Sequence, residues 1–158
     1  MDAISSTVRS AFQQIVKQLG QTFSWQDLTL LTASCRGKPL QFEQRDIPVA
    51  ITGYCLALRD VDLIVTRAGM DDVLTWTAKL HEMAHLLLRH LPDCSYGPLT
   101  PTYTAFRKAE HRQGIVYRAS EYDDPQERDA ELLATLLLDC ITQYETSLPK
   151  VARDIYGW

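Results

Sequence analysis

The stretch LHEMAHLLLRH, residues 80–90, decides the expected fold because it joins a metal-binding pattern to a helical one. His81, Glu82 and His85 form the pattern H-E-x-x-H. An α-helix turns by about 100° per residue, so the two histidines lie about 40° apart on one face, one turn apart along the axis. Both imidazoles can therefore reach one metal ion, and Glu82 lies beside them at about 100°.

Apolar side chains occupy another side of the same helix. They fall between about 200° and 280° from His81, as a core-facing stripe should. The histidines therefore face a second environment, which a core helix with incidental histidines would not need. His90 falls at about 180°, near the predicted helix end, where we expect an interaction with the C-terminal helix dipole rather than with a metal. The stripe consists of Trp76, Leu80, Met83, Leu87 and Leu91.

The H-E-x-x-H pattern predicts the chemistry of a zinc hydrolase. Zinc is commonly bound by imidazoles, and it lowers the pKa of its bound water from about 16 to about 7. A carboxylate beside the ligands can then take the proton as the water attacks a carbonyl. We therefore predict that His81 and His85 are metal ligands and that Glu82 is the general base.

A third ligand must come from elsewhere, because catalytic zinc sites commonly have three protein ligands. The segment PQERDAELLAT, residues 125–135, offers Glu127 and Glu131 on one helical face. In this E-x-x-A-E pattern we predict Glu127 as the ligand, with Glu131 accepting the free N–H of a ligating histidine. Glu131 and His111 stay open as alternative third ligands. Glu127 also has an alternative role, as part of a capping box that begins at Asp124.

The rest of the chain predicts an α+β fold. Two β-rich runs, residues 50–58 and 61–66, are joined at Arg59-Asp60, which indicates an antiparallel hairpin. The alternation in residues 40–44 adds a strand, so we predict a small, mostly antiparallel three-stranded sheet packed with helices. Residues 92–120 have weak periodicity and are expected to form a loop. Helical periodicity recurs over residues 4–20, 24–37, 71–91 and 123–144.

Composition sets broad limits on the class of protein. A chain of 158 residues with 46% apolar residues favours a single domain, residues 1–158, with a real core. The net charge of −4 and the lack of a long basic run disfavour direct nucleic-acid binding. No apolar run reaches the roughly 18 residues of a membrane span, and none of the four cysteines forms a C-x-x-C pair. We therefore expect a cytoplasmic protein without a membrane segment, a zinc knuckle or a disulfide framework.

The two motif helices resemble those of the ImmA/IrrE group of metallopeptidases, which are described by an H-E-x-x-H helix and a later E-x-x-A helix. The similarity runs over roughly residues 25–140, and its specific parts are LHEMAHLLLRH and ERDAELLATLLL. The resemblance implies a zincin-like fold with Zn²⁺ as the metal. It also implies His81, His85 and Glu127 as the ligands and Glu82 as the general base.

The resemblance also implies a function. Members of the group are zinc-dependent, often act in bacterial or phage regulatory systems, and in several cases cleave a helix-turn-helix repressor. We therefore expect a zinc-dependent endopeptidase whose partner is such a repressor on a separate chain. The alternatives are a metal-binding regulator that binds the repressor without cutting it, and a toxin component whose antitoxin is the neighbouring regulator. Glu82 favours the enzyme, because a binding module has no chemical need for a base beside two ligands.

Overall fold

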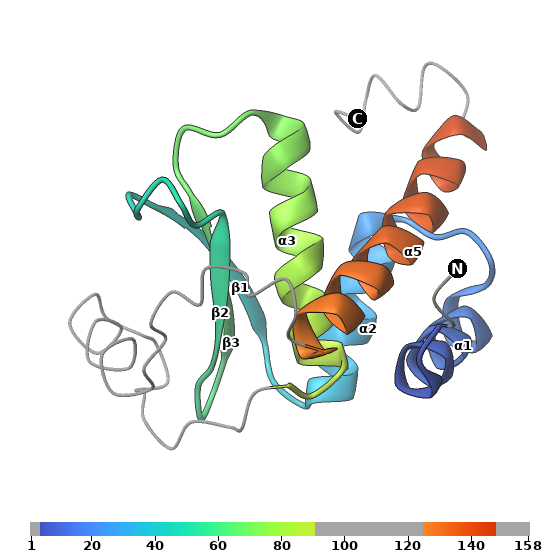
Figure 1. Ribbon diagram of the computed structural model, residues 1–158. Coiled ribbons are helices and arrows are strands. Elements are labelled where there is room, and N and C mark those ends of the chain that lie inside the picture. Colours follow the sequence, from blue (N-terminus) through green and yellow to red (C-terminus); the bar gives the residue numbers. More distant parts are fainter. Residues whose placement is uncertain (1–3, 91–124, 148–158) are drawn as a thin grey trace.

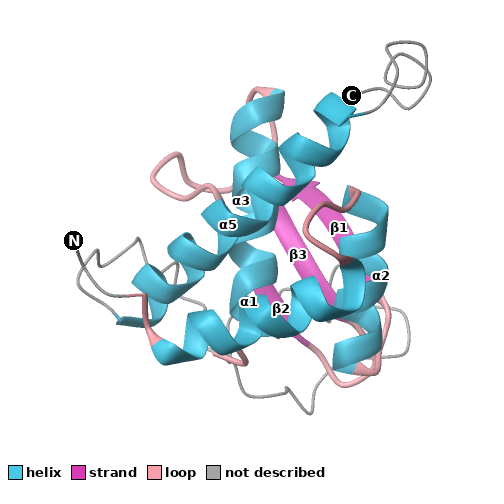
Figure 2. Ribbon diagram, turned by 90° about the vertical axis from the view of Figure 1, so that its right-hand side faces the viewer, coloured by secondary structure: helices cyan, strands magenta, loops and turns pink. Residues whose placement is uncertain are grey.

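The computed structural model describes residues 4–90 and 125–147, which form helices and one small sheet (Figure 1). The predicted α+β class with a three-stranded sheet is confirmed. The helices lie together on one side of the sheet, as Figure 2 shows. The elements in chain order are α1 (Ser6–Leu19), α2 (Trp25–Arg36), β1 (Leu40–Arg45), β2 (Gly53–Ala57), β3 (Asp62–Arg67), α3 (Asp72–Leu87) and α5 (Pro125–Ser147).

The sheet is mixed, so the expectation of a mostly antiparallel sheet holds for only one of its two ladders. The strand order is β1-β3-β2. Strands β2 and β3 form the predicted antiparallel hairpin, whereas β1 pairs with β3 in parallel. The reason is the path after β1: the chain crosses to the far edge of the sheet, and the hairpin then returns β3 between the two edge strands. β3 therefore runs in the same direction as β1.

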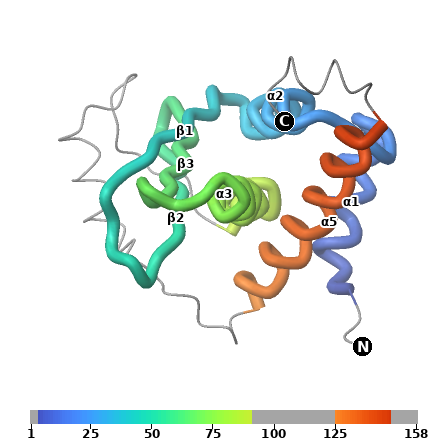
Figure 3. Tube along the Cα trace, turned by 90° about the horizontal axis from the view of Figure 1, so that it is seen from above, coloured from blue at the N-terminus to red at the C-terminus, as the bar shows by residue number. Residues whose placement is uncertain are grey.

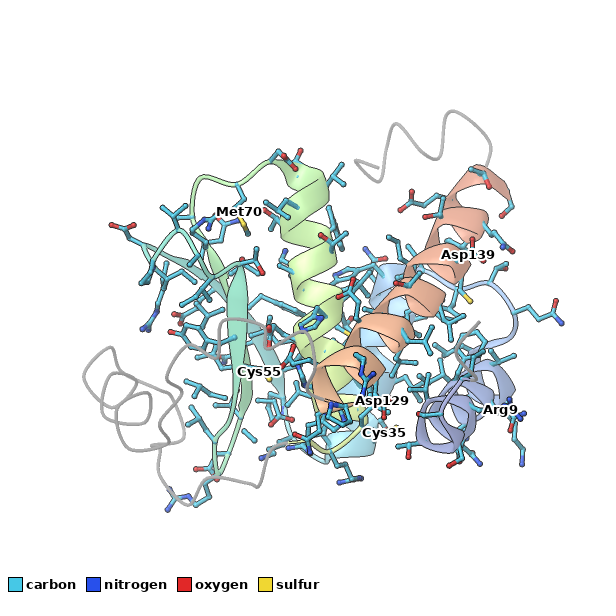
Figure 4. All side chains as sticks on the ribbon, viewed as in Figure 1. Arg9, Cys35, Cys55, Met70, Asp129 and Asp139 are labelled. Atoms are coloured by element: carbon cyan, nitrogen blue, oxygen red, sulfur yellow. The ribbon has the colours of Figure 1, made fainter. Side chains whose placement is uncertain are left out.

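Strand β3 suits the central position because it carries a continuous apolar run that can be covered on both faces. Leu63, Ile64 and Val65 are fully buried. Ile64 belongs to the main core with the helices, whereas Leu63 and Val65 belong to a second cluster of buried residues. Cys55 on β2 pairs with Ile64, and Figure 4 shows it on the side of the sheet that faces α3.

Helix α3 lies between the sheet and α5 (Figure 3). The predicted apolar stripe is confirmed at Leu80 and Met83, which are buried in the main core. The opposite side is covered as well, since Glu82 and His85 are each only 8% exposed. The second environment that the sequence predicted for the histidines is therefore the boundary between α3 and α5.

The ends of the helices follow local capping rules where the structure describes them. Ser24 and Asp27 form a capping box at the start of α2, with each side chain accepting the backbone N–H of the other. Gly37 ends α2 in the left-handed conformation, at φ 71°. Pro125 is the first residue of α5, as predicted. The expected cap at Asp124 lies outside the described residues.

A buried ion-pair cluster joins α2 to β3. The Asp62 carboxylate, whose side chain is 1% exposed, accepts hydrogen bonds from Arg36 Nε at 2.7 Å and from Arg36 Nη2 at 3.1 Å. Lys38 Nζ lies 3.4 Å from the same carboxylate and donates to the carbonyl of Leu58 at 2.6 Å. Each charge in this cluster therefore meets a partner of opposite sign or a backbone acceptor.

Helix α3 ends at Leu87, so the predicted continuation to residue 91 is wrong for residues 88–90. The expected loop at residues 92–120 lies outside the described residues.

Candidate metal centre

Three predicted ligands converge where the last turns of α3 meet the first turn of α5. The Nε2 atoms of His81 and His85 lie 3.2 Å apart. Glu127 spans the pair: one carboxylate oxygen lies 2.9 Å from Nε2 of His81, and the other lies 3.1 Å from Nε2 of His85. One ligand atom from each residue lies within 4.8 Å of the others, so the group could hold a metal ion.

Helices α3 and α5 pack together and both contribute small side chains to the core. Ala84 on α3 and Ala130 and Ala134 on α5 are buried in the main core. The separation of packed helices depends on the size of the side chains between them. Ala130 and Ala134 lie three and seven residues after Glu127, near its helical face, and their small side chains favour a close approach of its carboxylate to both imidazoles.

Glu131 contacts the other nitrogen of His81. Its carboxylate lies 3.0 Å from Nδ1 of His81, on the far side of the ring from Glu127. An ionised carboxylate can only accept, so Nδ1 carries the proton and donates it to Glu131. A neutral His81 then turns the lone pair of Nε2 toward the carboxylate of Glu127 at 2.9 Å. That contact is repulsive unless a second proton or a cation lies between the two atoms.

The pKa shifts of His81 and Glu127 also favour a positive charge between them. Burial lowers the pKa of His81, but the hydrogen bond to Glu127 and the charges of Glu82, Glu127 and Glu131 outweigh it and raise the pKa to about 9. Hydrogen bonds from His81 and His85 hold the pKa of Glu127 well below its usual range. A divalent cation suits this set of two imidazoles and a carboxylate, which is a donor set of catalytic zinc sites.

Glu82 lies beside the ligands rather than among them. Its side chain points to β2, where it is hydrogen-bonded to the thiol of Cys55. Burial raises the pKa of Cys55 well above its usual value, so the thiol keeps its proton and donates it to the carboxylate. Burial also raises the pKa of Glu82, and the neighbouring His85 and His81 oppose that rise. The carboxylate is thus held next to the cluster by a neutral donor.

His90 approaches the site by a path that the helical wheel did not predict. Arg89 has a left-handed backbone, with φ 57°, and turns the chain back at the end of α3. The N–H of His90 donates to the carbonyl of His85 at 3.0 Å. The Nδ1 atoms of the two rings lie 2.9 Å apart. The expected position at about 180° from His81 is wrong, because it assumed a helix that continues through residues 88–90.

The sequence analysis missed Cys55 and the contact of His90 for different reasons. A histidine five residues after a ligand is compatible with a helix-ending turn, but such turns usually have glycine in the left-handed position, where this chain has Arg89. No pattern links Cys55 to Glu82, because they lie on separate elements. His111, the alternative third ligand, lies outside the described residues.

The site can be compared with the rest of the described chain and with known proteins. Within residues 4–90 and 125–147, the cluster of His81, His85 and Glu127 is the group found close enough to share one ion. In the same ranges, no helix combines the length and the apolar character that a membrane crossing requires. No protein-family model, curated protein or solved structure matches the chain.

Proposed function

We propose that the chain is a zinc-dependent endopeptidase that cleaves a partner helix-turn-helix repressor in a bacterial or phage regulatory system. The observation that carries the proposal is the position of Glu127, whose two oxygens lie 2.9 and 3.1 Å from the Nε2 atoms of His81 and His85. The resemblance of the two motif helices to the ImmA/IrrE group supports the choice of substrate. The zincin-like fold and the cytoplasmic location stay predictions.

The metal site is held by this chain's own side chains. His81, His85 and Glu127 supply three ligands, which is the number usual in catalytic zinc sites that keep a position open. A zinc ion bound there supplies Lewis-acid chemistry by activating water and polarising a carbonyl. Glu131 orients His81 by accepting the proton of Nδ1 at 3.0 Å.

Glu82 takes the role of general base and acid. It is adjacent in sequence to the ligand His81 and is buried beside the ligand cluster, with its carboxylate close enough to influence the charge of both histidines. From there the carboxylate accepts a proton from the attacking water and returns it to the leaving amine. The hydrogen bond from Cys55 restrains the carboxylate on the side of β2.

Glu82 also argues for an enzyme over a binding protein. Burying a carboxylate is unfavourable unless the group is well partnered, and a structural metal site does not require one beside its ligands. A regulator that binds a repressor without cutting it, or a toxin held by such a regulator, would need the metal ligands but not Glu82. The substitution Glu82→Gln therefore distinguishes an enzyme from a regulator or toxin that does not cleave its partner.

The experiment is co-expression with the proteins encoded beside this chain, among which we expect a helix-turn-helix regulator. We expect the wild-type chain to cleave that regulator and Glu82→Gln to leave it intact. The wild-type chain and the Glu82→Gln variant should each bind about one zinc equivalent, since the substitution leaves the three ligands in place. Gel analysis of the regulator and metal analysis of the purified chains measure the two effects separately.

Two results would contradict the proposal. If Glu82→Gln derepresses the target genes as well as the wild-type chain does, binding without cleavage explains the function. If the wild-type chain purifies with another divalent metal and cleaves with that metal but not with zinc, the reaction stands and the assignment of zinc is wrong.

A further inference from the structure

We propose that His90 is a positioning residue of the metal centre, which fixes the ring of His85 by accepting a hydrogen bond between the two Nδ1 atoms. The inference rests on the proposed function in one respect, because it takes His85 as a metal ligand. The contact itself is a separate observation: the two Nδ1 atoms lie 2.9 Å apart, and the rings meet at 64°.

The backbone at the end of α3 brings the two rings together. Leu88 caps the helix, Arg89 adopts the left-handed conformation, and the N–H of His90 donates to the carbonyl of His85. The N–H of Arg89 donates to the carbonyl of Leu86 at 3.1 Å. These two bonds define a Schellman turn. In such a turn the second residue after the cap packs against the residue three positions before the cap. In this chain those two residues are His90 and His85.

The turn is also held from outside. A residue other than glycine in the left-handed region is uncommon and persists when its surroundings hold it there. Arg89 Nη2 donates to the backbone carbonyl of Cys35, near the end of α2, at 3.4 Å. The label of Cys35 in Figure 4 marks this end of α2, beside the end of α3. The contact ties the turn that carries His90 to a neighbouring helix.

The protons on the two rings can be assigned from the metal site. With an ion bound, Nε2 of His85, which faces Glu127 and His81, offers its lone pair to the ion instead of a proton to Glu127. A neutral imidazole has one N–H and one lone pair, so Nδ1 of His85 carries the proton. Nδ1 of His90 must then be the acceptor, and the proton of His90 lies on Nε2. One tautomer of each ring satisfies both contacts.

The two ligating histidines thus have different outer partners. His81 donates to Glu131, whose side chain is 73% exposed. His85 donates to His90, and the side chain of His85 is only 10% exposed. Water competes more strongly for the exposed contact than for the covered one. We therefore expect His90 to contribute more to metal affinity than Glu131, although Glu131 is charged and His90 accepts as a neutral ring.

Three substitutions of His90 test the hydrogen bond apart from packing. Asparagine carries an amide oxygen on Cγ, at the position of Nδ1 in histidine, whereas glutamine carries its oxygen one bond further out and alanine has no acceptor. His90→Ala and His90→Gln should weaken zinc binding by roughly 10- to 100-fold, as outer-shell changes do, and His90→Asn should stay close to wild type. Glu131→Gln provides the comparison, with a smaller loss.

Zinc affinity is measured by competition with a chelator, and the visible spectrum of the cobalt-substituted protein reports the ligand geometry. The cobalt spectrum should change in His90→Ala and be restored in His90→Asn. Nitrogen chemical shifts of the zinc-loaded wild-type protein give a second readout that needs no substitution. We expect the proton on Nδ1 in His85 and on Nε2 in His90.

Each contrary result has a distinct meaning. If His90→Ala binds zinc as tightly as wild type, or if the wild-type tautomers are reversed, His90 does not position His85, while the metal centre itself stands. If His90→Asn is as weak as His90→Ala, packing rather than the hydrogen bond explains the loss, and the proposal is overturned. If the wild-type chain binds no zinc, both this proposal and the proposed zinc enzyme fall.

Discussion

Two clusters of charged and ionisable side chains lie at different boundaries between the elements of this molecule, and they differ in how donors and acceptors are matched. At the boundary of α2 and β3, the Asp62 carboxylate faces the donors of Arg36 and Lys38. At the boundary of α3 and α5, the Glu127 carboxylate faces two imidazole nitrogens that also lie 3.2 Å from each other. The carboxylate of the first cluster has permanently charged donors, whereas that of the second is matched only when an extra proton or a cation lies between it and the imidazoles.

This difference in donors distinguishes a structural ion pair, at Asp62, from a candidate ion site, at Glu127. Buried polar groups normally have a hydrogen-bond partner, and a buried pair with its donors in place needs nothing further. In the second cluster, His81 donates a hydrogen bond from Nδ1 to Glu131, so in the neutral ring the lone pair of Nε2 faces the carboxylate of Glu127. A surplus of converging acceptors is therefore typical of a group that could hold a cation, whereas a balanced cluster is typical of a contribution to folding.

The largest effect is expected from removing an acceptor of the second cluster. His85→Ala removes one of three ligands, so zinc affinity should fall by more than the roughly 100-fold that changes outside the ligand shell can cause. Metal analysis and chelator competition measure the loss. Glu145→Gln, on the same helix as Glu127 but near its other end, should bind zinc as wild type does. An unchanged zinc content in His85→Ala would remove the distinction between the two clusters.

A smaller effect, on folding rather than on metal, is expected in the first cluster. Asp62→Asn leaves Arg36 and Lys38 without their buried counter-charge, which should lower the free energy of unfolding by about 3–5 kcal/mol. Zinc affinity of the folded protein should not change.

The matched control for that substitution is Asp60→Asn. Asp60 pairs with Arg59 at 3.0 Å, but the side chain of Arg59 is 59% exposed, so this pair should contribute only about 0–1 kcal/mol. Urea denaturation compares the two variants directly. Equal midpoints would show that the buried cluster does not stabilise the fold more than a surface pair does.

The smallest effect is expected on the number of protons that zinc binding releases. The pKa of His81 is raised to about 9 in the metal-free site, so the ring carries an extra proton at pH 7. Zinc must displace that proton, so binding should release about one proton, and affinity should rise roughly tenfold per pH unit up to about pH 9. Calorimetry at pH 7 in buffers of different ionisation enthalpy measures the release. Binding heats that do not depend on the buffer would contradict a protonated His81.

The spacing of residues along single helices determined the core of the site from sequence. Two histidines four residues apart must share a helical face, and so must Glu127 and Glu131. The tight connection at Arg59-Asp60 likewise indicated the hairpin of β2 and β3, which the structure has. These relations are local, because a few backbone dihedral angles of one regular element set the directions of the side chains.

The partnerships between elements were decided only by the tertiary structure. The direction of β1 against β3 depends on the path of the chain around the sheet, and the contact of Glu82 with Cys55 depends on how α3 packs on β2. Helical spacing gives the direction of a side chain but not what the next element places opposite it.

The end of α3 shows most directly where local rules stop. The helical wheel put His90 away from the ligands, yet one left-handed residue, Arg89, turns it back onto His85. Glycine adopts that conformation at no steric cost and can be recognised in a sequence, whereas arginine adopts it only when contacts such as the one with Cys35 hold it there. The sequence by itself thus determined which residues share the side of each helix that faces the candidate metal centre. The fold decided which groups surround them, because those contacts join segments that no spacing rule connects.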